Sequence, residues 1–299
     1  MPNIKTILVT GSSGQLGLSL KMIAKDYPDY DFIFAQREQL DLSNGKSITA
    51  FFKQNKFDLI INCAAFTAVD KAESEPELAD KLNHLAVKQL AEISTQHNTK
   101  LIHISTDYVF DGTQCRPYIE TDKVAPQSIY GETKLKGEQA LLAAMPNNAL
   151  IIRTSWVYSE FGNNFVKTMM RLGQERDALT VIFDQVGTPT YAHDLAEAIM
   201  TIVTSDTFKQ IEFASELYHY SNEGVCSWYD FAKAIFELSK INCDVSPIET
   251  KDYPTPAKRP HYSLLNKAKI KQRYNVSVPY WKQSLQHCLN KLAQQELSS

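Results

Sequence analysis

The chain has 299 residues, of which 43% are hydrophobic and 22% are charged, and its formal net charge is −3. These values are typical of a globular chain with one large domain or two moderate ones, and they exclude intrinsic disorder. Because no basic cluster stands out, the sequence offers no electrostatic footprint for nucleic acid or a membrane surface, whereas an anionic small molecule remains compatible.

The first predicted unit is a strand, a glycine turn and a helix. Residues 5–10 form an apolar, β-branched run typical of a buried parallel strand, and residues 18–24 have helical apolar spacing. Between them, glycines allow a tight turn beside a pyrophosphate, whose charge the helix N-terminus meets. The turn therefore predicts a dinucleotide site at Gly11, Gly14, Gln15, Leu16 and Gly17.

The second predicted strand covers residues 30–35 and ends close to Arg37. At this strand end an acidic residue binds a ribose 2′-hydroxyl, or an arginine binds a 2′-phosphate. Arg37 therefore favours NADPH, although NADH stays open because a plain surface role is the alternative for this side chain. Asp41 and Leu42 follow, and we expect them under the adenine, before a helix at residues 46–54.

The next units continue the alternation of strands and helices. A strand at residues 59–62 ends in small residues, where we expect Ala64, Ala65 and Phe66 to let a cofactor pass close to the chain. A helix at residues 78–94 and a strand at 100–104 follow. This order predicts an α/β fold with a Rossmann-like, doubly wound parallel sheet, whose ligands bind at the carboxyl ends of the strands.

A tyrosine and a lysine stand four residues apart at the start of the next predicted helix, near residue 129. Tyr130 and Lys134 therefore share one helix face. A lysine ammonium close to the phenol lowers the pKa of the tyrosine, which can then exchange a proton near neutral pH. The helix brings this pair to the strand end that carries Thr106 and Asp107.

The second half of the chain is less regular. A strand at residues 150–154 precedes Trp156, which we expect over the site, and helices are predicted near 164–174, 194–203, 228–239 and 281–292. Residues 255–260 contain two prolines and cannot be helix interior. We expect an NAD(P)-binding domain at 1–155 and mainly a smaller substrate-binding lobe at 156–299, with the chain free to cross back.

The five cysteines are odd in number, widely separated and without a Cys-x-x-Cys pair, which argues against a disulfide framework and a zinc site. No signal-peptide pattern opens the chain, and no apolar run approaches the roughly 18 residues of a membrane helix. We therefore expect a cytoplasmic protein with reduced thiols.

These motifs resemble the extended short-chain dehydrogenase/reductase family. Within it, four segments resemble the dTDP-4-dehydrorhamnose reductase family, namely residues 67–73, 105–112, 153–158 and 254–260. The resemblance implies Tyr130 as proton donor, Lys134 as its partner and ribose anchor, and Thr106 as the hydroxyl that holds the keto oxygen. It also implies Asp107 and Trp156 as sugar contacts.

The implied reaction is the NAD(P)H-dependent reduction of the 4-keto group of a dTDP-linked 4-keto-6-deoxy sugar, with dTDP-L-rhamnose as product. Because a deoxysugar has few hydroxyls, the carrier diphosphate should supply most of the affinity, and Arg259 is the candidate cation. Some members of the family form a magnesium-linked dimer through glutamates. One of these glutamates lies within the glycine turn, at the position where this chain has Gln15. An amide is a poorer magnesium ligand than a carboxylate, which argues against the metal and leaves a homodimer open.

Three alternatives differ in testable ways. A sugar-nucleotide dehydratase needs a second acid next to Asp107, where Tyr108 stands. An epimerase turns over without added NADPH. A non-catalytic NADP-binding regulatory subunit, similar to that of methionine adenosyltransferase, is the alternative from another class, and the complete set of Thr106, Tyr130 and Lys134 argues against it.

Overall fold

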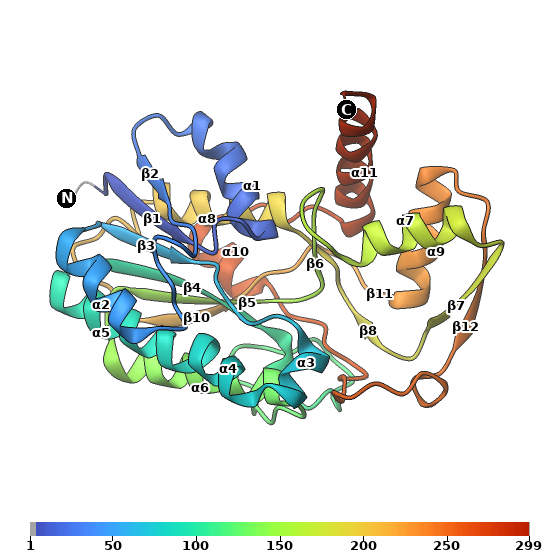
Figure 1. Cartoon of the computed structure of the whole chain (residues 1–299), viewed down its shortest axis with the longest axis horizontal. Coiled ribbons are helices and arrows are strands. Elements are labelled where there is room, and N and C mark those ends of the chain that lie inside the picture. The colour runs from blue at the N-terminus through green and yellow to red at the C-terminus, as the bar shows by residue number, and fades with distance from the viewer. Residues whose placement is uncertain (1–3, 299) are drawn as a thin grey trace.

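The computed structural model describes residues 4–298 and shows two bodies between which the chain crosses several times (Figure 1). The larger body contains a six-stranded sheet in the order β10-β5-β4-β3-β1-β2, in which every pair is parallel. Its strands are β1 (Thr6–Thr10), β2 (Asp31–Phe34), β3 (Leu59–Asn62), β4 (Lys100–Thr106), β5 (Ala149–Thr154) and β10 (Glu216–His219). The predicted Rossmann-like parallel sheet is confirmed.

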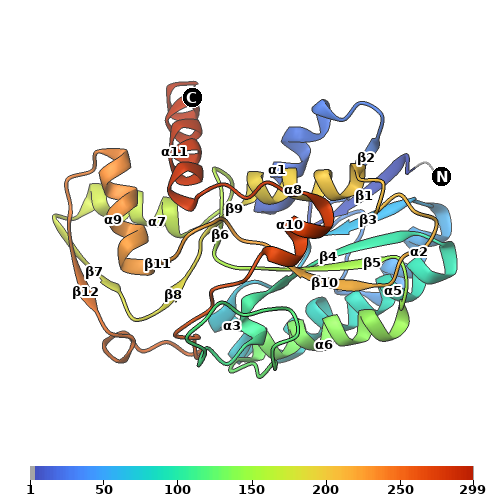
Figure 2. The same ribbon diagram turned by 180° about the vertical axis from the view of Figure 1, so that it is seen from behind.

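Helices cover both faces of this sheet (Figures 1 and 2). One face packs on α1 (Gln15–Ile23), α8 (Ala192–Thr204) and α10 (Ala268–Tyr274), and the other on α2 (Gly45–Gln54), α5 (Ala86–His97) and α6 (Ile129–Ala144). In β1, Ile7 and Val9 join the first core and Leu8 joins the second. Burial on both faces explains why the strands are continuous apolar runs rather than alternating ones.

The strand order reverses between β1 and β3. After β1 the chain adds β2 on one side, and it then places β3, β4 and β5 on the other side. The turns that follow β1 and β3 therefore diverge toward opposite faces and leave a crevice at their carboxyl ends, which is where ligands of doubly wound sheets bind.

The smaller body has a core of its own around Phe231. It contains α7 (Phe165–Glu175), α9 (Trp228–Ser239), and the parallel pair β7 (Ala178–Ile182) and β12 (Asp244–Ile248). Two short ladders, β6 (Val157–Tyr158) with β9 (Thr190–Tyr191) and β8 (Val186–Gly187) with β11 (Cys226–Ser227), form near the crossings. The last helix, α11 (Trp281–Ser298), projects beyond both bodies at its C-terminal end (Figure 1).

The structure differs from the sequence-based expectation in three stretches of the larger body, one of which is the unpredicted helix α10. The region predicted as one helix at 78–94 consists of the end of α4 (Pro76–Asp80), a π-helical turn at Lys81–Leu85 and most of α5, and α3 (Val69–Ser74) precedes it. Strand β10 was not predicted, because its four residues lie between loops and only pairing with β5 makes them a strand. Short 3₁₀ turns occupy Ala24–Asp26, Asp107–Val109 and Thr250–Asp252.

None of the helices within residues 4–298 combines the length and the apolar character that crossing a membrane requires.

Candidate active site

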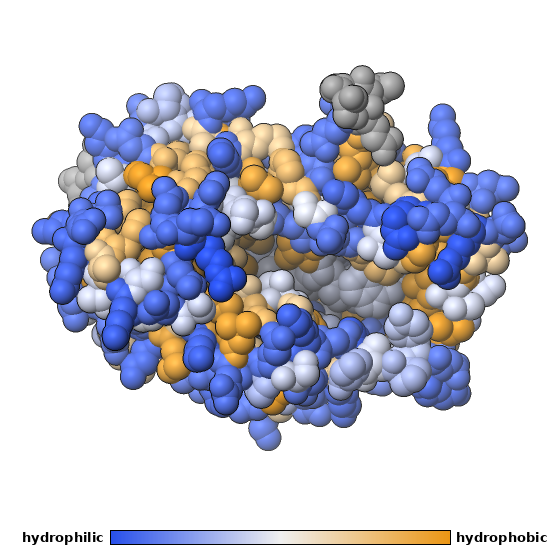
Figure 3. Space-filling view, in the orientation of Figure 1, coloured by the Kyte–Doolittle hydropathy of each residue, from blue (hydrophilic) through white to orange (hydrophobic). Residues whose placement is uncertain are grey.

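A cleft of ≈ 720 Å³ lies at the carboxyl ends of the central strands, where the surface is hollowed between the two bodies (Figure 3). Most of the residues predicted to bind cofactor or substrate line this cleft. They are Gly11, Gly14, Gln15, Leu16, Arg37, Asp41, Leu42, Ala64, Ala65, Thr106, Asp107, Tyr130, Lys134 and Trp156. Gly17, Phe66 and Arg259 were also predicted and are not part of the lining.

The glycine turn has no room for side chains. Gly11 has φ +62°, and a Cβ on it would lie 2.6 Å from the backbone nitrogen of Ala64 in the neighbouring strand end. A Cβ on Gly17 would collide with the carbonyl oxygen of Gly11, so Gly17 acts by letting α1 pack against the turn. Helix α1 has no side-chain cap at Gly14 and no acidic residue in its first turn. Its free amides suit a pyrophosphate.

The end of β2 places Arg37 and Asp41 at the cleft. The Arg37 side chain is 76% exposed, and its Nε lies 3.6 Å from Asp41 Oδ1. Hydrogen bonding from Ser43 is the largest cause that lowers the pKa of Asp41, with a smaller contribution from Arg37. Arg37 thus carries an available charge close to where the ribose of a dinucleotide is expected.

Tyr130 enters the cleft in the first turn of α6, whose N-cap Ser128 accepts a hydrogen bond from the Gly131 nitrogen at 3.2 Å. The Tyr130 side chain lines the cleft together with that of Thr106, which lies at the end of β4. Burial raises the pKa of Tyr130 to about 12, and Thr106 opposes this rise. The phenol and the threonine hydroxyl together form a two-point site for an oxygen atom.

Lys134 lies one helical turn further along α6 and is 1% exposed. Its Nζ donates to the carbonyl oxygen of Ile104 at 2.6 Å and lies 3.3 Å from His103 Nε2. Burial lowers the pKa of Lys134 to about 8. The expectation that the pKa of Tyr130 lies near neutrality is therefore wrong, because burial outweighs any effect of the Lys134 ammonium on the phenol.

Asp107 is buried directly behind the Thr106 hydroxyl, which donates to Asp107 Oδ1 at 3.0 Å. Burial raises the pKa of Asp107 to about 6, and hydrogen bonds from Ser263 and Thr106 counteract this rise. Beside it, the ring of Tyr108 lies 5.4 Å from that of Tyr130 in an edge-on arrangement. Asp107 thus orients Thr106 while both line the cleft.

Trp156 forms the wall that belongs to the second half of the chain. It has φ +48°, an unusual value for a bulky residue, and its ring stacks on that of Trp228 with centroids 3.6 Å apart. Trp228 also lines the cleft and was not predicted, because its place at the start of α9 resembled a core position. Two stacked indoles present one broad apolar face to a ligand.

Arg259 already has a partner in the protein. Its guanidinium forms a bidentate ion pair with Asp70, with Nη1–Oδ1 at 3.0 Å and Nη2–Oδ2 at 2.7 Å, and its side chain is 22% exposed. Arg259 is therefore held by an ion pair, and its role as the cation for a diphosphate stays a prediction. Phe66 was predicted to lie along the cofactor, and its contacts here are made by its backbone. Its nitrogen donates to Asn83 Oδ1, and its carbonyl oxygen accepts from Asn83 Nδ2.

The side-chain amide of Gln15 forms hydrogen bonds with other residues of the chain. Its Oε1 accepts hydrogen bonds from Ser159 Oγ and Asn164 Nδ2, each at 3.0 Å, and its Nε2 donates to the Val157 carbonyl at 3.2 Å. Over the described range 4–298, no group of three or more His, Cys, Asp or Glu side chains could hold a metal ion. Gln15 thus links the glycine turn to the smaller body.

A phosphate-binding turn at the switch point of a parallel sheet, beside a tyrosine and a lysine on one helix, is the arrangement of the extended short-chain dehydrogenases/reductases. These proteins are oxidoreductases that use a nicotinamide dinucleotide. The residues present fit such a cofactor, since the turn leaves open backbone where the pyrophosphate lies.

Comparison with known proteins narrows this class. The family model described as RmlD substrate binding domain matches residues 5–294. The dTDP-4-dehydrorhamnose reductase of Aggregatibacter actinomycetemcomitans is 40% identical over 292 residues, which cover 94% of this chain and 97% of the relative. The chain belongs to the dTDP-4-dehydrorhamnose reductase family.

Solved structures agree with this assignment. A dTDP-4-dehydrorhamnose reductase from Clostridium acetobutylicum is similar with a TM-score of 0.90 and 41% identity, covering 96% of this chain and 99% of its own. The enzyme of the same name from Bacillus anthracis, solved in complex with NADP, has a TM-score of 0.89 and 36% identity over the same shares.

Proposed function

We propose that this chain reduces the 4-keto group of dTDP-4-dehydro-L-rhamnose with NADPH and releases dTDP-L-rhamnose. The observation that carries the proposal is that Thr106, Tyr130 and Lys134 line the same cleft as the glycine turn. The names of relatives at about 40% identity and the NADP complex of the Bacillus anthracis enzyme support it.

In this reaction the carbonyl carbon receives a hydride, which a bound nicotinamide supplies, and the carbonyl oxygen receives a proton. Tyr130 gives its hydroxyl proton to that oxygen, while Thr106 holds the oxygen once its hydroxyl hydrogen turns from Asp107 to the substrate. A phenol whose pKa is about 12 keeps its proton at neutral pH until negative charge develops on the substrate. The ammonium form of Lys134 then stabilises the phenolate that remains.

The smaller body is assigned to the sugar nucleotide. Residues 1–155 bind the cofactor in this proposal, and residues 156–299 supply mainly substrate contacts, with the stacked indoles of Trp156 and Trp228 against the sugar. Asp107 and Thr106 hold sugar oxygens from the opposite wall. Arg259 can meet the carrier diphosphate while it keeps its ion pair with Asp70, because the guanidinium has five N–H donors and Asp70 accepts two of them.

The decisive experiment follows NADPH and NADH oxidation spectrophotometrically with a panel of 4-keto nucleotide sugars. We expect oxidation with dTDP-4-dehydro-L-rhamnose and a product with a 4-hydroxyl group in the rhamnose configuration. Turnover without added NADPH would indicate an epimerase. Tight NADPH binding without oxidation of any sugar would favour the regulatory subunit.

Replacing Arg37 by alanine should weaken NADPH binding by roughly 1.5–3 kcal/mol, the range for hydrogen bonds to a charged group, and leave NADH binding unchanged. The physical reason is that only NADPH carries the 2′-phosphate that Arg37 would meet. Fluorescence titration with both cofactors measures the difference. Arg171→Ala is a matched control, because Arg171 is also exposed and paired four residues along its chain. Equal losses for both cofactors would show that Arg37 has a structural role.

A further inference from the structure

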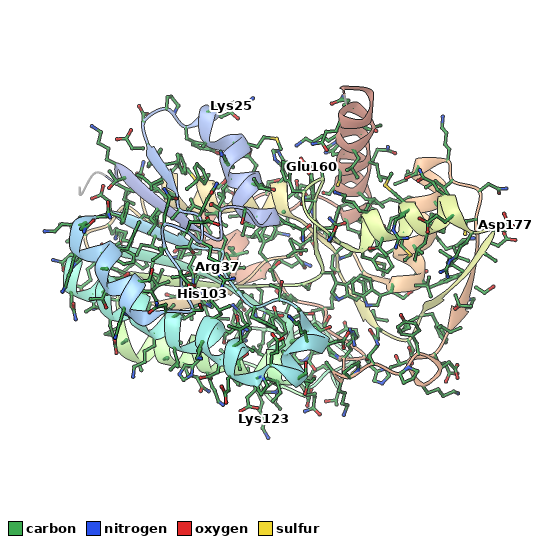
Figure 4. All side chains as sticks on the ribbon, viewed as in Figure 1. Lys25, Arg37, His103, Lys123, Glu160 and Asp177 are labelled. Carbon is green, nitrogen blue, oxygen red and sulfur yellow. The ribbon has the colours of Figure 1, made fainter. Side chains whose placement is uncertain are left out.

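Behind the cleft, four buried side chains form a hydrogen-bonded series from β1 to α6. Thr10 Oγ1 donates to Asn62 Oδ1 at 2.6 Å, Asn62 Nδ2 lies 3.0 Å from His103 Nδ1, and His103 Nε2 lies 3.3 Å from Lys134 Nζ. The strand register creates the series, since Thr10 pairs with Asn62 and Asn62 with His103. His103 is labelled in Figure 4 and lies in the larger body. None of the four residues is more than 1% exposed, so solvent does not compete for these hydrogen bonds.

The direction of the hydrogen bonds is fixed at Asn62. The backbone nitrogen of Ala64 can only donate, and it donates to Asn62 Oδ1 at 3.2 Å. Asn62 Nδ2 must therefore face His103 and donate to Nδ1. A neutral imidazole that accepts at Nδ1 carries its proton on Nε2. His103 consequently presents an N–H donor to the Nζ of Lys134.

This donor opposes a charge on Lys134. An ammonium group has donors only, whereas a neutral amine can accept the proton of His103 and still donate to the Ile104 carbonyl. The doubly protonated ring is disfavoured, because burial and then Lys134 lower the pKa of His103 well below its ordinary value. The ring does not carry protons through the series either, since the Asn62 amide cannot reprotonate it.

We propose that His103 is a positioning residue which biases Lys134 toward its neutral form through a hydrogen-bond donor whose direction Asn62 fixes. Burial acts in the same sense and lowers the pKa of Lys134 to about 8. Lys134 shares the lining of the cleft with the titratable side chains of Cys63, Asp107, Tyr108 and Tyr130, and Glu138, which pairs with Arg153, lies one turn further along α6. Of these, Glu138 raises the pKa of Lys134.

The kinetic consequence rests on the proposed function. If the ammonium form of Lys134 stabilises the Tyr130 phenolate, reduction is fastest below the pKa of Lys134 and slows as pH rises through it. A stronger donor from His103 moves this alkaline limb to lower pH. Loss of the donor moves the limb to higher pH.

Replacing His103 by leucine tests the inference directly. We expect the midpoint of the Lys134 titration to rise by about one pH unit, which corresponds in energy to about one hydrogen bond next to a charged group. The measurement is NMR of the full chain with isotope-labelled lysine, in which the Lys134 signal is identified by its loss in Lys134→Met. In a parallel assay, the alkaline limb of kcat for NADPH oxidation should move in the same direction.

Three further variants make the outcome specific. His103→Gln keeps an acceptor for Asn62 and a donor for Lys134, so it should preserve the wild-type titration. Asn62→Leu lets the ring proton of His103 move to Nδ1, so it should raise the midpoint of the Lys134 titration as His103→Leu does. This variant replaces His103→Leu if the latter does not fold. His219→Leu removes another buried imidazole of the same sheet, on β10, and should leave Lys134 unchanged.

An unchanged Lys134 titration in folded His103→Leu or Asn62→Leu would overturn the inference. The NMR arm needs neither cofactor nor substrate. If the titration moves as expected and no 4-keto sugar is reduced, the inference stands and the proposed function fails.

Discussion

Replacing Tyr130 by phenylalanine should lower kcat by at least ~10²-fold, the scale of a lost general acid, while NADPH affinity stays within a few-fold of the wild type. Phenylalanine keeps the ring in its edge-on contact with Tyr108 and removes only the hydroxyl that shares the cleft with Thr106. Steady-state kinetics with dTDP-4-dehydro-L-rhamnose and a fluorescence titration with NADPH measure the two quantities separately.

Tyr108→Phe is the matched comparison, because it removes a second hydroxyl from the same cleft. Its loss should be less than about tenfold if protonation of the keto oxygen belongs to Tyr130 alone. Full turnover by Tyr130→Phe would remove this residue from the mechanism. Equal losses in both variants would mean that the hydroxyls act only through the shape and polarity of the cleft.

Breaking the ion pair of Glu138 and Arg153 should destabilise the fold by about 3–5 kcal/mol, the cost of leaving one charge buried without its partner. Arg153 Nε and Nη2 lie 2.9 and 2.6 Å from the two carboxylate oxygens of Glu138, and the two side chains are 4% and 2% exposed. Ser105 Oγ donates to the same carboxylate at 2.5 Å. Urea unfolding of Arg153→Met should show the loss.

Two comparisons define this result. Arg171→Met breaks a pair whose side chains are 60% and 52% exposed, and it should cost less than about 1 kcal/mol. The double variant Glu138→Leu with Arg153→Met removes both charges and should recover much of the loss, because an apolar pair of similar volume needs no compensation. A single variant as stable as the wild type would contradict the argument.

The parts of the site that the sequence predicts share a simple origin. Apolar strands followed by glycine or alanine mark the carboxyl ends of a parallel sheet, which is why the positions of Gly11, Ala64 and Thr106 in one cleft could be expected. The helical spacing of Tyr130 and Lys134 gave their common face in the same way. Each of these features follows from residues close together in the sequence, or from the rule that ligands bind at the carboxyl ends of parallel strands.

The remaining features depend on contacts between distant segments. Arg259 reads as a free cation until the fold brings Asp70 against it, 189 positions away. Trp228 reads as a core aromatic until it stacks on Trp156. The expected pKa of Tyr130 was wrong because helical spacing says nothing about how deeply the fold buries the phenol. The spacing of residues along the chain does not show which distant side chain each residue will contact in the fold.

The amide of Gln15 has a mechanical consequence for catalysis. Its three hydrogen bonds fasten the turn that faces the cofactor to the segment at residues 157–164, which begins next to Trp156. A cofactor at the turn and a sugar at Trp156 would therefore lie against one continuous wall, whose two halves are held together by a single side chain. Because Asn164 is also the N-cap of α7, the same amide connects the start of this helix to the glycine turn.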